Sequence, residues 1–418
     1  MNLIIYSLAA LAVGFYYLTV IRYGSNIPIA DDFDAVLDFL NNFLEVSSIH
    51  DKIALIFSQH NEHRIVFTRL IVVAQYYLLN TVNFKVLIMI GNIGLIGILI
   101  VIFLSYNKRS LIWFVPVVFI LFEPQYFGAI FFAMGTIQNF YVLLFAFLSL
   151  YFLTRDGSLN FITAAVFAVM ATFTSGNGIL CFIAGALVLL IQKRFRFLAV
   201  WLSVMSLNII IYLYGYVPPA DHPNMLRTLL TQPGTAVIYF IVLLGTVVYL
   251  PFKMDNAEIF SPALFIPIGM GVLLSVVFIY LTIKKYYLKN TAIYSFIVFI
   301  LLSEVLTAAG RSGFGVANAL STRYAIMSVL LVIFAYIALI ETIDGETIHR
   351  YFHLVLVAAI SFNILAFYIN YDKIITLHQS VEQGLIYFQK YNRGLVYPNQ
   401  EKAGRILIRS INKGYYRL

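Results

Sequence analysis

Apolar stretches long enough to cross a membrane recur along this chain, and they leave few folds open to it. They run to about 16–23 residues each and continue through residue 369, which as α-helix matches a hydrocarbon core of about 30 Å. Inside a bilayer only helices and closed barrels satisfy their own backbone polar groups. With 61% hydrophobic and 11% charged residues, and a mean hydropathy of +0.90, the composition is far from that of a soluble protein. The sequence predicts an all-α polytopic membrane protein.

Basic clusters between the apolar stretches predict how the chain is oriented. Because Lys and Arg gather in cytoplasmic loops, we place on that side the clusters that contain Arg109, Arg155, Arg194, Lys285 and Arg350. The N-terminus is then cytoplasmic, and the first apolar stretch is a retained helix rather than a signal peptide. Eleven spans are expected: 2–21, 84–106, 110–122, 136–154, 159–175, 177–192, 197–216, 261–283, 291–309, 323–341 and 350–369.

Two further apolar segments, 65–80 and 233–250, do not fit this count. If both crossed, the basic clusters between them would lie outside, so we expect interfacial or re-entrant helices on the external face. Span 110–122 is short and contains a proline, which favours a tilted or partly embedded helix. We therefore expect two parts. The first is a transmembrane catalytic domain, 1–369, whose external loop 22–83 carries the pair Asp31-Asp32, and the second is a small external segment, 370–418.

Cysteine usage and net charge exclude several classes of function. The single cysteine, Cys181, lies in an apolar stretch, so neither an intrachain disulfide nor a cysteine-rich metal site is available. The net charge of +8 comes from 27 basic against 19 acidic residues. Cytoplasmic loops explain such an excess in a membrane protein, and we do not expect nucleic acid as a partner.

The first external loop begins with two consecutive carboxylates, Asp31 and Asp32. Charges stay near a bilayer only where something specific holds them. Adjacent helical residues point about 100° apart, so the two are expected to meet different partners, one as general base and one as an orienting group. The alternative is a plain helix N-cap. Residues 33–45 alternate apolar and polar side chains at helical spacing, which predicts an amphipathic helix in the headgroup plane.

The same loop contains the polar run Gln59-His60-Asn61-Glu62-His63-Arg64, directly before an apolar helix. The Arg64 guanidinium could bind a lipid phosphate together with that of Arg69, or both could anchor the helix at the interface. Glu62 and His63 are candidates for the same substrate site. His60 and His63 are three residues apart, which on a helix is metal-ligand spacing. Because the run lacks the His-Glu-x-x-His pattern, we assign no metal site.

A third polar cluster joins the end of one apolar stretch to the start of another. Glu304 lies within the first, Gly310-Arg311-Ser312-Gly313-Phe314-Gly315 follows, and Arg323 and Tyr324 open the next. The glycines permit a tight loop with exposed backbone N–H groups, which together with the two arginines predict an anion cradle. A Glu304–Arg311 pair would be the structural alternative. Three weaker candidates lie at external helix ends, where we expect them to act as helix caps or ordinary loop residues: Glu123, Asn177 and Asp221-His222.

Taken together, these features resemble the GT-C class of polyprenyl-phosphate-sugar-dependent glycosyltransferases. The resemblance covers the architecture of the whole chain: a first helix that ends in a loop with an Asp-Asp pair, interfacial helices, many further spans and an external C-terminal segment. Its sharp motifs are Asp31-Asp32, 59–64 and 310–324. Length, hydropathy and the placement of the Asp pair are similar to the serotype-converting O-antigen glucosyltransferases of enteric bacteria and their phages.

The resemblance implies a mechanism in the bacterial inner membrane. A sugar, glucose in that subfamily, arrives on undecaprenyl phosphate in the periplasmic leaflet. Asp31 or Asp32 takes the proton from a hydroxyl of a lipid-linked O-antigen or lipopolysaccharide acceptor. Attack at the anomeric carbon inverts it, and Arg64, Arg311 or Arg323 holds the charge of the leaving phosphate. Some members of the class use a divalent cation such as Mg²⁺ or Mn²⁺ and others do not, so the cofactor stays open.

Two other functions are compatible with a polytopic chain of this kind. A transporter or flippase for a lipid-linked saccharide would use Glu304 and the arginines to line a pathway. However, the polar groups crowd one face of the protein, and we find no inverted repeat. An O-antigen polymerase would also use external arginines, but it would leave the Asp pair without a task. The sequence therefore favours glycosyl transfer.

Overall fold

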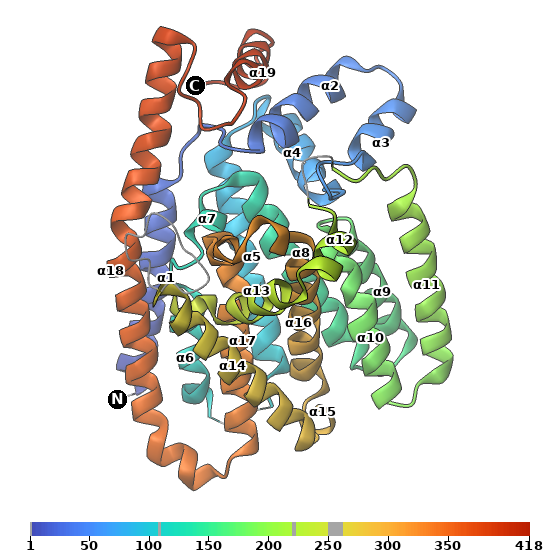
Figure 1. Ribbon diagram of the computed structural model, residues 1–418, viewed down its shortest axis with the longest axis vertical. Coiled ribbons are helices and arrows are strands. Elements are labelled where there is room, and N and C mark those ends of the chain that lie inside the picture. The colour runs from blue at the N-terminus through green and yellow to red at the C-terminus, as the bar shows by residue number, and fades with distance from the viewer. Residues whose placement is uncertain (1, 108–109, 220–222, 250–261) are drawn as a thin grey trace.

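The computed structural model describes residues 2–107, 110–219, 223–249 and 262–418. Over these residues the protein is 81% helical and contains no strands, as predicted for an all-α polytopic membrane protein (Figure 1). Among the described residues, eight helices are long and apolar enough to cross a bilayer. They are α1 (Asn2–Tyr23), α5 (Phe84–Ser105), α8 (Ala133–Leu153), α11 (Phe195–Leu213), α14 (Pro262–Ile283), α16 (Thr291–Arg311), α17 (Ala325–Thr342) and α18 (Gly345–Tyr391).

Each of the eleven predicted spans overlaps a helix, but three of these helices are short. Span 110–122 corresponds to η2 (Leu111–Phe114) with α6 (Val115–Leu121), and span 159–175 to α9 (Ser158–Thr172). Span 177–192 corresponds to η3 (Gly176–Ile179) with α10 (Leu180–Ile191). At 10–17 residues, none reaches across a hydrocarbon core of about 30 Å unless the bilayer is locally thinned. Eight long spans are therefore supported, and the total of eleven stays a prediction.

The segments predicted not to cross are short or broken. Segment 65–80 forms α4 (Val66–Leu79), and 233–250 contains α13 (Pro233–Gly245) and η4 (Thr246–Val248). The preceding α12 (Met225–Thr231) meets α13 at a bend of 106°, as in a broken span or re-entrant loop. Pro233, in the first turn of α13, has no N–H to continue a helix from α12. A Cβ on Gly245 would lie 1.8 Å from Pro267 O, so α13 and α14 cross with their backbones in contact.

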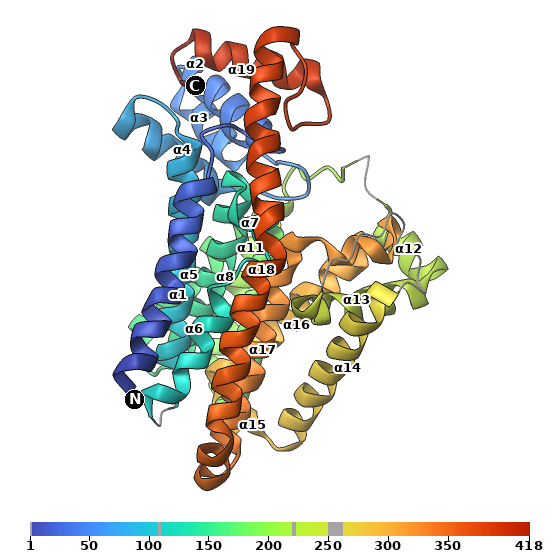
Figure 2. The same cartoon turned by 90° about the vertical axis from the view of Figure 1, so that its left-hand side faces the viewer.

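The long helices run between two ends of unlike character (Figures 1 and 2). One end carries the N-terminus and α15 (Tyr286–Lys289), together with the basic connections at 155 and 194; we call it the α15 end. The other, the α19 end, carries α2 (Phe39–Glu45), α3 (Ile49–Phe57), α19 (Gln400–Asn412) and the C-terminus. The 47 residues of α18 run between the two ends, about 70 Å at 1.5 Å per residue. No break in this helix marks the predicted boundary at residue 370.

The first loop folds under the C-terminal helix. Its amphipathic segment is a π-helical turn, η1 (Phe33–Asp38), followed by α2 (Phe39–Glu45). The apolar face is buried, and the acidic face pairs with α19 (Gln400–Asn412): Lys402 Nζ lies 2.7 Å from Asp34 Oδ1, and Arg409 Nη2 lies 2.6 Å from Glu45 Oε2. The apolar face of this helix therefore packs within the protein, and its position in the headgroup plane stays a prediction. Helix α3 (Ile49–Phe57), by contrast, buries none of its residues.

Candidate functional site

The two neighbouring aspartates have different surroundings. Asp32 is 1% exposed, and its carboxylate accepts hydrogen bonds from Met134 N (2.8 Å) and Ile29 N (3.3 Å). Met134 lies in the first turn of α8, where free N–H groups and the helix dipole favour a carboxylate. The Asp31 side chain is 42% exposed and lies beside His60, with 3.9 Å between Oδ2 and Nε2. Asp32 therefore orients the loop, and Asp31 alone is presented outward.

The same difference in surroundings moves the two pKa values in opposite directions. Burial raises the pKa of Asp32 to about 7, and the main-chain donor of Met134 offsets only part of that rise. For Asp31, the imidazole of His60 lowers the pKa, with a further contribution from the charge of Arg323. Asp31 is therefore ionised at neutral pH, as a general base must be.

The burial of Asp32 predicts a pH-dependent stability. A carboxyl whose pKa is raised on folding, here from 3.8 to about 7, contributes stability that is present below pH 4 and is lost as the pH rises through 7. We expect the thermal midpoint of the wild type, relative to that of Asp32→Asn, to fall as the pH is raised from 4 to 7. Calorimetry in detergent at a series of pH values measures this difference. Parallel curves over that range would show that Asp32 is ionised in the folded protein.

The run 59–64 forms a tight turn, not a helix. His60 N donates to His63 O (2.8 Å), and His63 N donates to His60 O (2.9 Å). Asn61 at the tip has a φ of +48°, a conformation that asparagine adopts more readily than most residues. The two histidines therefore do not share a helical face: His60 points toward Asp31, while His63 Nδ1 accepts from Gly176 N (3.2 Å). Among the described residues, no group of three or more His, Cys, Asp and Glu side chains could hold a metal ion.

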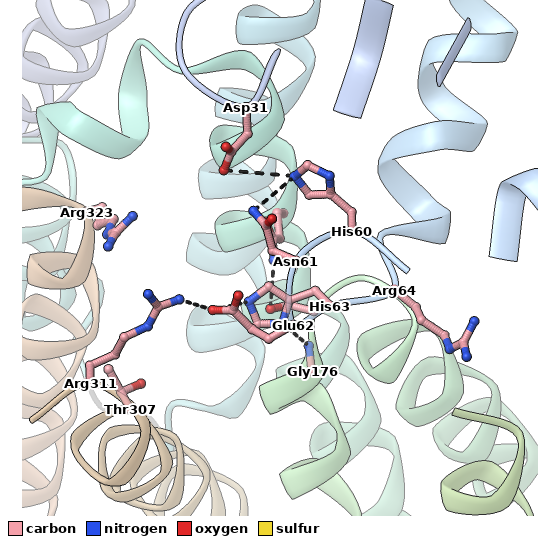
Figure 3. Close-up of polar contacts among 12 residues, drawn as sticks. Asp31, His60, Asn61, Glu62, His63, Arg64, Gly176, Thr307, Arg311 and Arg323 are labelled. Carbon is pink, nitrogen blue, oxygen red and sulfur yellow. Dashed lines mark hydrogen bonds and ion pairs between the residues drawn. The ribbon is translucent and has the colours of Figure 1, made fainter. Parts of the chain in front are cut away.

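Arg64 points away from this site (Figure 3), which corrects its predicted role on a phosphate. Its Nε donates to Tyr212 O (2.7 Å), and its two terminal nitrogens donate to Phe57 O and Tyr214 O. These carbonyls belong to the C-terminal ends of α3 and α11, where helical carbonyls lack partners. Arg69 caps α3 in the same way, through Leu55 O (2.8 Å). Both guanidinium groups are therefore used in holding helix ends.

Arg311 and Arg323 lie on the opposite side of the turn 59–64 from Arg64 (Figure 3). Arg311, the last residue of α16, forms an ion pair with Glu62. Arg323 is exposed; its Nη2 donates to Tyr324 Oη (3.0 Å), and its guanidinium lies 4.9 Å from the centre of the Tyr324 ring. Five predicted residues, Glu62, His63, Arg311, Arg323 and Tyr324, thus lie with Asp31 in one polar cluster built from three separate loops.

The loop between the two arginines is not the open cradle that its glycines predict. It folds into three 3-10 turns, η5 (Ser312–Phe314), η6 (Val316–Leu320) and η7 (Thr322–Tyr324). The turns use the backbone donors: Gly315 N bonds to Ser312 O (3.0 Å), and Tyr324 N to Ser321 O (3.0 Å). The cationic side chains, not the backbone N–H groups, therefore supply the positive charge. A Cβ on Gly128 would lie 2.4 Å from Thr322 Oγ1, so α7 (Phe127–Ile130) supports the turn that carries Arg323.

Glu304 does not pair with Arg311, which corrects the second predicted contact. It is 1% exposed within α16, two turns below Arg311, and its Oε1 has no hydrogen-bond partner among the described residues. Of the weaker candidates, Glu123 is fully buried and accepts from Gln125 N (2.6 Å). Asn177 Nδ2 donates to Ser303 Oγ (3.4 Å). Asp221 and His222 lie outside the described residues.

Sequence reasoning missed how two residues support this cluster. His60 was considered only as a metal ligand, yet it is the side chain nearest to Asp31 among the charged partners. Gly176 anchors His63 through its main chain, and a Cβ there would lie 3.1 Å from His63 Nδ1. The polar turn at 175–178 was the only signal for this contact. Because this turn lies more than 100 residues from His63 in the sequence, nothing predicted a contact between the two.

An ionised carboxylate, an imidazole and two guanidinium groups can bind an anion and accept a proton next to it. Asp31, Arg311 and Arg323 come from segments about 280 residues apart, and in Figure 3 they approach the same region from different sides. A guanidinium fork matches phosphate oxygens, and a carboxylate beside it suits a hydroxyl that must lose a proton. Comparisons with known proteins add no name to this chemistry: the chain matches no protein family, no curated protein and no solved structure.

Proposed function

We propose that the chain is an integral membrane glycosyltransferase of the GT-C type. It moves a sugar, glucose by its resemblance to O-antigen glucosyltransferases, from undecaprenyl phosphate to an O-antigen or related glycan. The reaction takes place on the periplasmic face of the bacterial inner membrane. The observation that carries the proposal is the gathering of ionised Asp31 with Arg311 and Arg323 at one end of a bundle of apolar helices.

Each residue of the cluster has a role in this reaction. Asp31 accepts the proton of the acceptor hydroxyl as its oxygen bonds to the anomeric carbon. The bond from that carbon to the phosphate oxygen breaks on the opposite face, so the product is inverted. Arg311 and Arg323 stabilise the negative charge of the leaving lipid phosphate. Glu62 forms an ion pair with Arg311, and in this proposal a phosphate oxygen takes the place of Glu62 when the donor binds.

The test is transfer by the purified protein in lipid nanodiscs. The protein is mixed with undecaprenyl-phosphate-linked glucose and a lipid-linked O-antigen repeat, and mass spectrometry follows the acceptor. A gain of one hexose supports the proposal. No gain with this donor or other polyprenyl-linked sugars would overturn it. Movement of the lipid-linked saccharide between leaflets, or lengthening of the glycan by whole repeats, would then identify a transporter or a polymerase.

Removing Arg323 is expected to weaken use of the donor without harming the fold. Its exposed guanidinium donates to the neighbouring Tyr324 hydroxyl and to no helix-end carbonyl among the described residues, so Arg323→Ala should cost about 1.5–3 kcal/mol of donor binding for one charge-assisted hydrogen bond. That is a rise of about 10- to 100-fold in the Kd for undecaprenyl phosphate, measured by calorimetry in nanodiscs. Arg196→Ala, which removes an exposed arginine at the α15 end, is the matched control. Equal Kd values for the two variants would take Arg323 out of the donor site.

A further inference from the structure

The C-terminal segment 392–418, called here the C-terminal clamp, contacts the main chain immediately before Asp31. Val396 O accepts a hydrogen bond from Ala30 N (2.7 Å). Ala30 has a φ of +46°, a left-handed conformation that is uncommon for a residue with a Cβ and persists only where its surroundings impose it. Relaxation of this residue would rotate the two carboxylates that follow. The clamp therefore supports the backbone geometry that presents Asp31 and buries Asp32.

The clamp also contacts the chain immediately after the aspartate pair. Lys402 Nζ lies 2.7 Å from Asp34 Oδ1, and the Tyr397 hydroxyl donates to Asp34 Oδ2. The Tyr397 ring packs on Phe33, with 5.5 Å between ring centres. Asp34 lies in the π-helical turn η1, a wide and rare helical form that recurs at functional sites. Residues on both sides of Asp31 are thus held by the same segment.

The clamp has its own anchors on the bundle, so it is a fixed support and not a loose tail. Its helix α19 buries Ala403 and Leu407 completely. A buried hydrogen bond joins Asn41 Nδ2 to Ser410 Oγ (2.9 Å), and Tyr415 O accepts from Val82 N (2.8 Å). Figure 2 shows α19 next to α2 of the first loop, at the top of the molecule in that view.

We propose that the C-terminal clamp positions Asp31 for proton transfer, with Tyr397 and Lys402 as positioning residues that act through Asp34 and Ala30. The inference rests on the proposed function and adds residues to it. The contacts described for the clamp reach the residues that flank Asp31, and none reaches Arg311 or Arg323. Weakening the clamp should therefore slow the chemical step and leave donor binding unchanged. Small displacements of a catalytic group cost about 100-fold in rate, so partial release should lower kcat by about 10- to 100-fold.

The test uses the full-length protein with single substitutions in the clamp. Lys402→Glu places a negative charge against Asp34, and Lys402→Arg keeps the positive charge. Arg405→Glu makes the same change of charge on the outer face of α19, where the side chain is 74% exposed. We expect Lys402→Glu to lower kcat with the KM for the donor within about twofold, and the other two to resemble the wild type. Tyr397→Phe, which loses only the hydroxyl, should lower kcat in the same way if Lys402→Glu does not fold.

Hydrogen exchange separates failure of the clamp from failure of the proposed function. The Ala30 amide, bonded to Val396 O, should exchange faster in Lys402→Glu than in Arg405→Glu. Faster exchange with an unchanged kcat, or a rise in KM in place of a fall in kcat, would overturn the positioning role. A wild type with no transferase activity would overturn the proposed function. Unchanged exchange at Ala30 would then overturn the clamp as well, by a measurement that needs no substrate.

Discussion

Asp31→Asn is expected to lower the rate of hexose transfer by about 10²- to 10⁴-fold, the usual contribution of a positioned general base. The amide keeps the size of the side chain but cannot accept the proton of the acceptor hydroxyl. Because the Asp31 side chain is 42% exposed, the fold should be unchanged. The rate is measured by mass spectrometry of the acceptor at saturating donor, with the thermal midpoint recorded on the same sample.

Asp51→Asn is the matched control, because it neutralises an exposed carboxylate on α3 that lies beside the neighbouring His50 and away from Asp31 in the sequence. It should transfer at the wild-type rate. Asp32→Asn makes the comparison sharper, since its effects should appear in stability and its pH dependence before they appear in rate. Wild-type transfer by Asp31→Asn would remove the general base from the mechanism. A larger loss in Asp32→Asn would exchange the roles of the two residues.

Arg64→Ala is expected to cost about 3 kcal/mol or more in stability. Its guanidinium satisfies main-chain carbonyls at the ends of two helices, α3 and α11. Hydrogen bonds from a charged donor contribute about 1.5–3 kcal/mol each, and removing the donor leaves these acceptors without a partner. Unfolding in detergent, followed by circular dichroism, should show a large fall in the midpoint. Arg64→Lys should restore little, because one ammonium group lacks the planar fork that reaches divergent acceptors.

Arg323→Ala is the comparison for this second experiment. It removes the same side chain from an exposed position, so it should leave the midpoint unchanged while it weakens donor binding. If instead Arg64→Ala were stable and bound undecaprenyl phosphate poorly, Arg64 would belong to the donor site, as its sequence context suggested. The two arginines differ only in what surrounds them. Measuring both the unfolding midpoint and donor binding for each variant shows which arginine caps helix ends and which binds the donor.

The helices could be predicted from the sequence because apolar runs report directly on burial in lipid or in the bundle. The break before α13 was also foreseeable, since Pro233 interrupts the run. Helical geometry predicted that Asp31 and Asp32 meet different partners, but it did not predict which of the two is buried. That depends on Met134, about 100 residues away, which supplies the main-chain donor.

The residues that sequence reasoning misplaced are those whose partners lie far along the chain. The sequence around Arg64 predicts a phosphate ligand, but its guanidinium donates to the main-chain carbonyls of Tyr212 and Tyr214. The acidic face of residues 34–45 was predicted to face the headgroups, but its carboxylates form ion pairs with α19. Glycines at 313 and 315 permit an open loop but do not exclude 3-10 turns that use the same N–H groups. Composition and periodicity carry no information on such pairings.

The continuous α18 connects the clamp to the opposite end of the bundle. This helix begins at Gly345 near the α15 end and reaches Tyr391 next to the clamp, so it acts as a rigid rod that spans the hydrocarbon core and continues beyond it. A change in lipid chain length alters the tilt of such a rod. Because the clamp at its far end is bonded to the first loop at Asp34 and Glu45, we expect the clamp and the aspartate pair to move together, so that Asp31 keeps its alignment as the lipid changes.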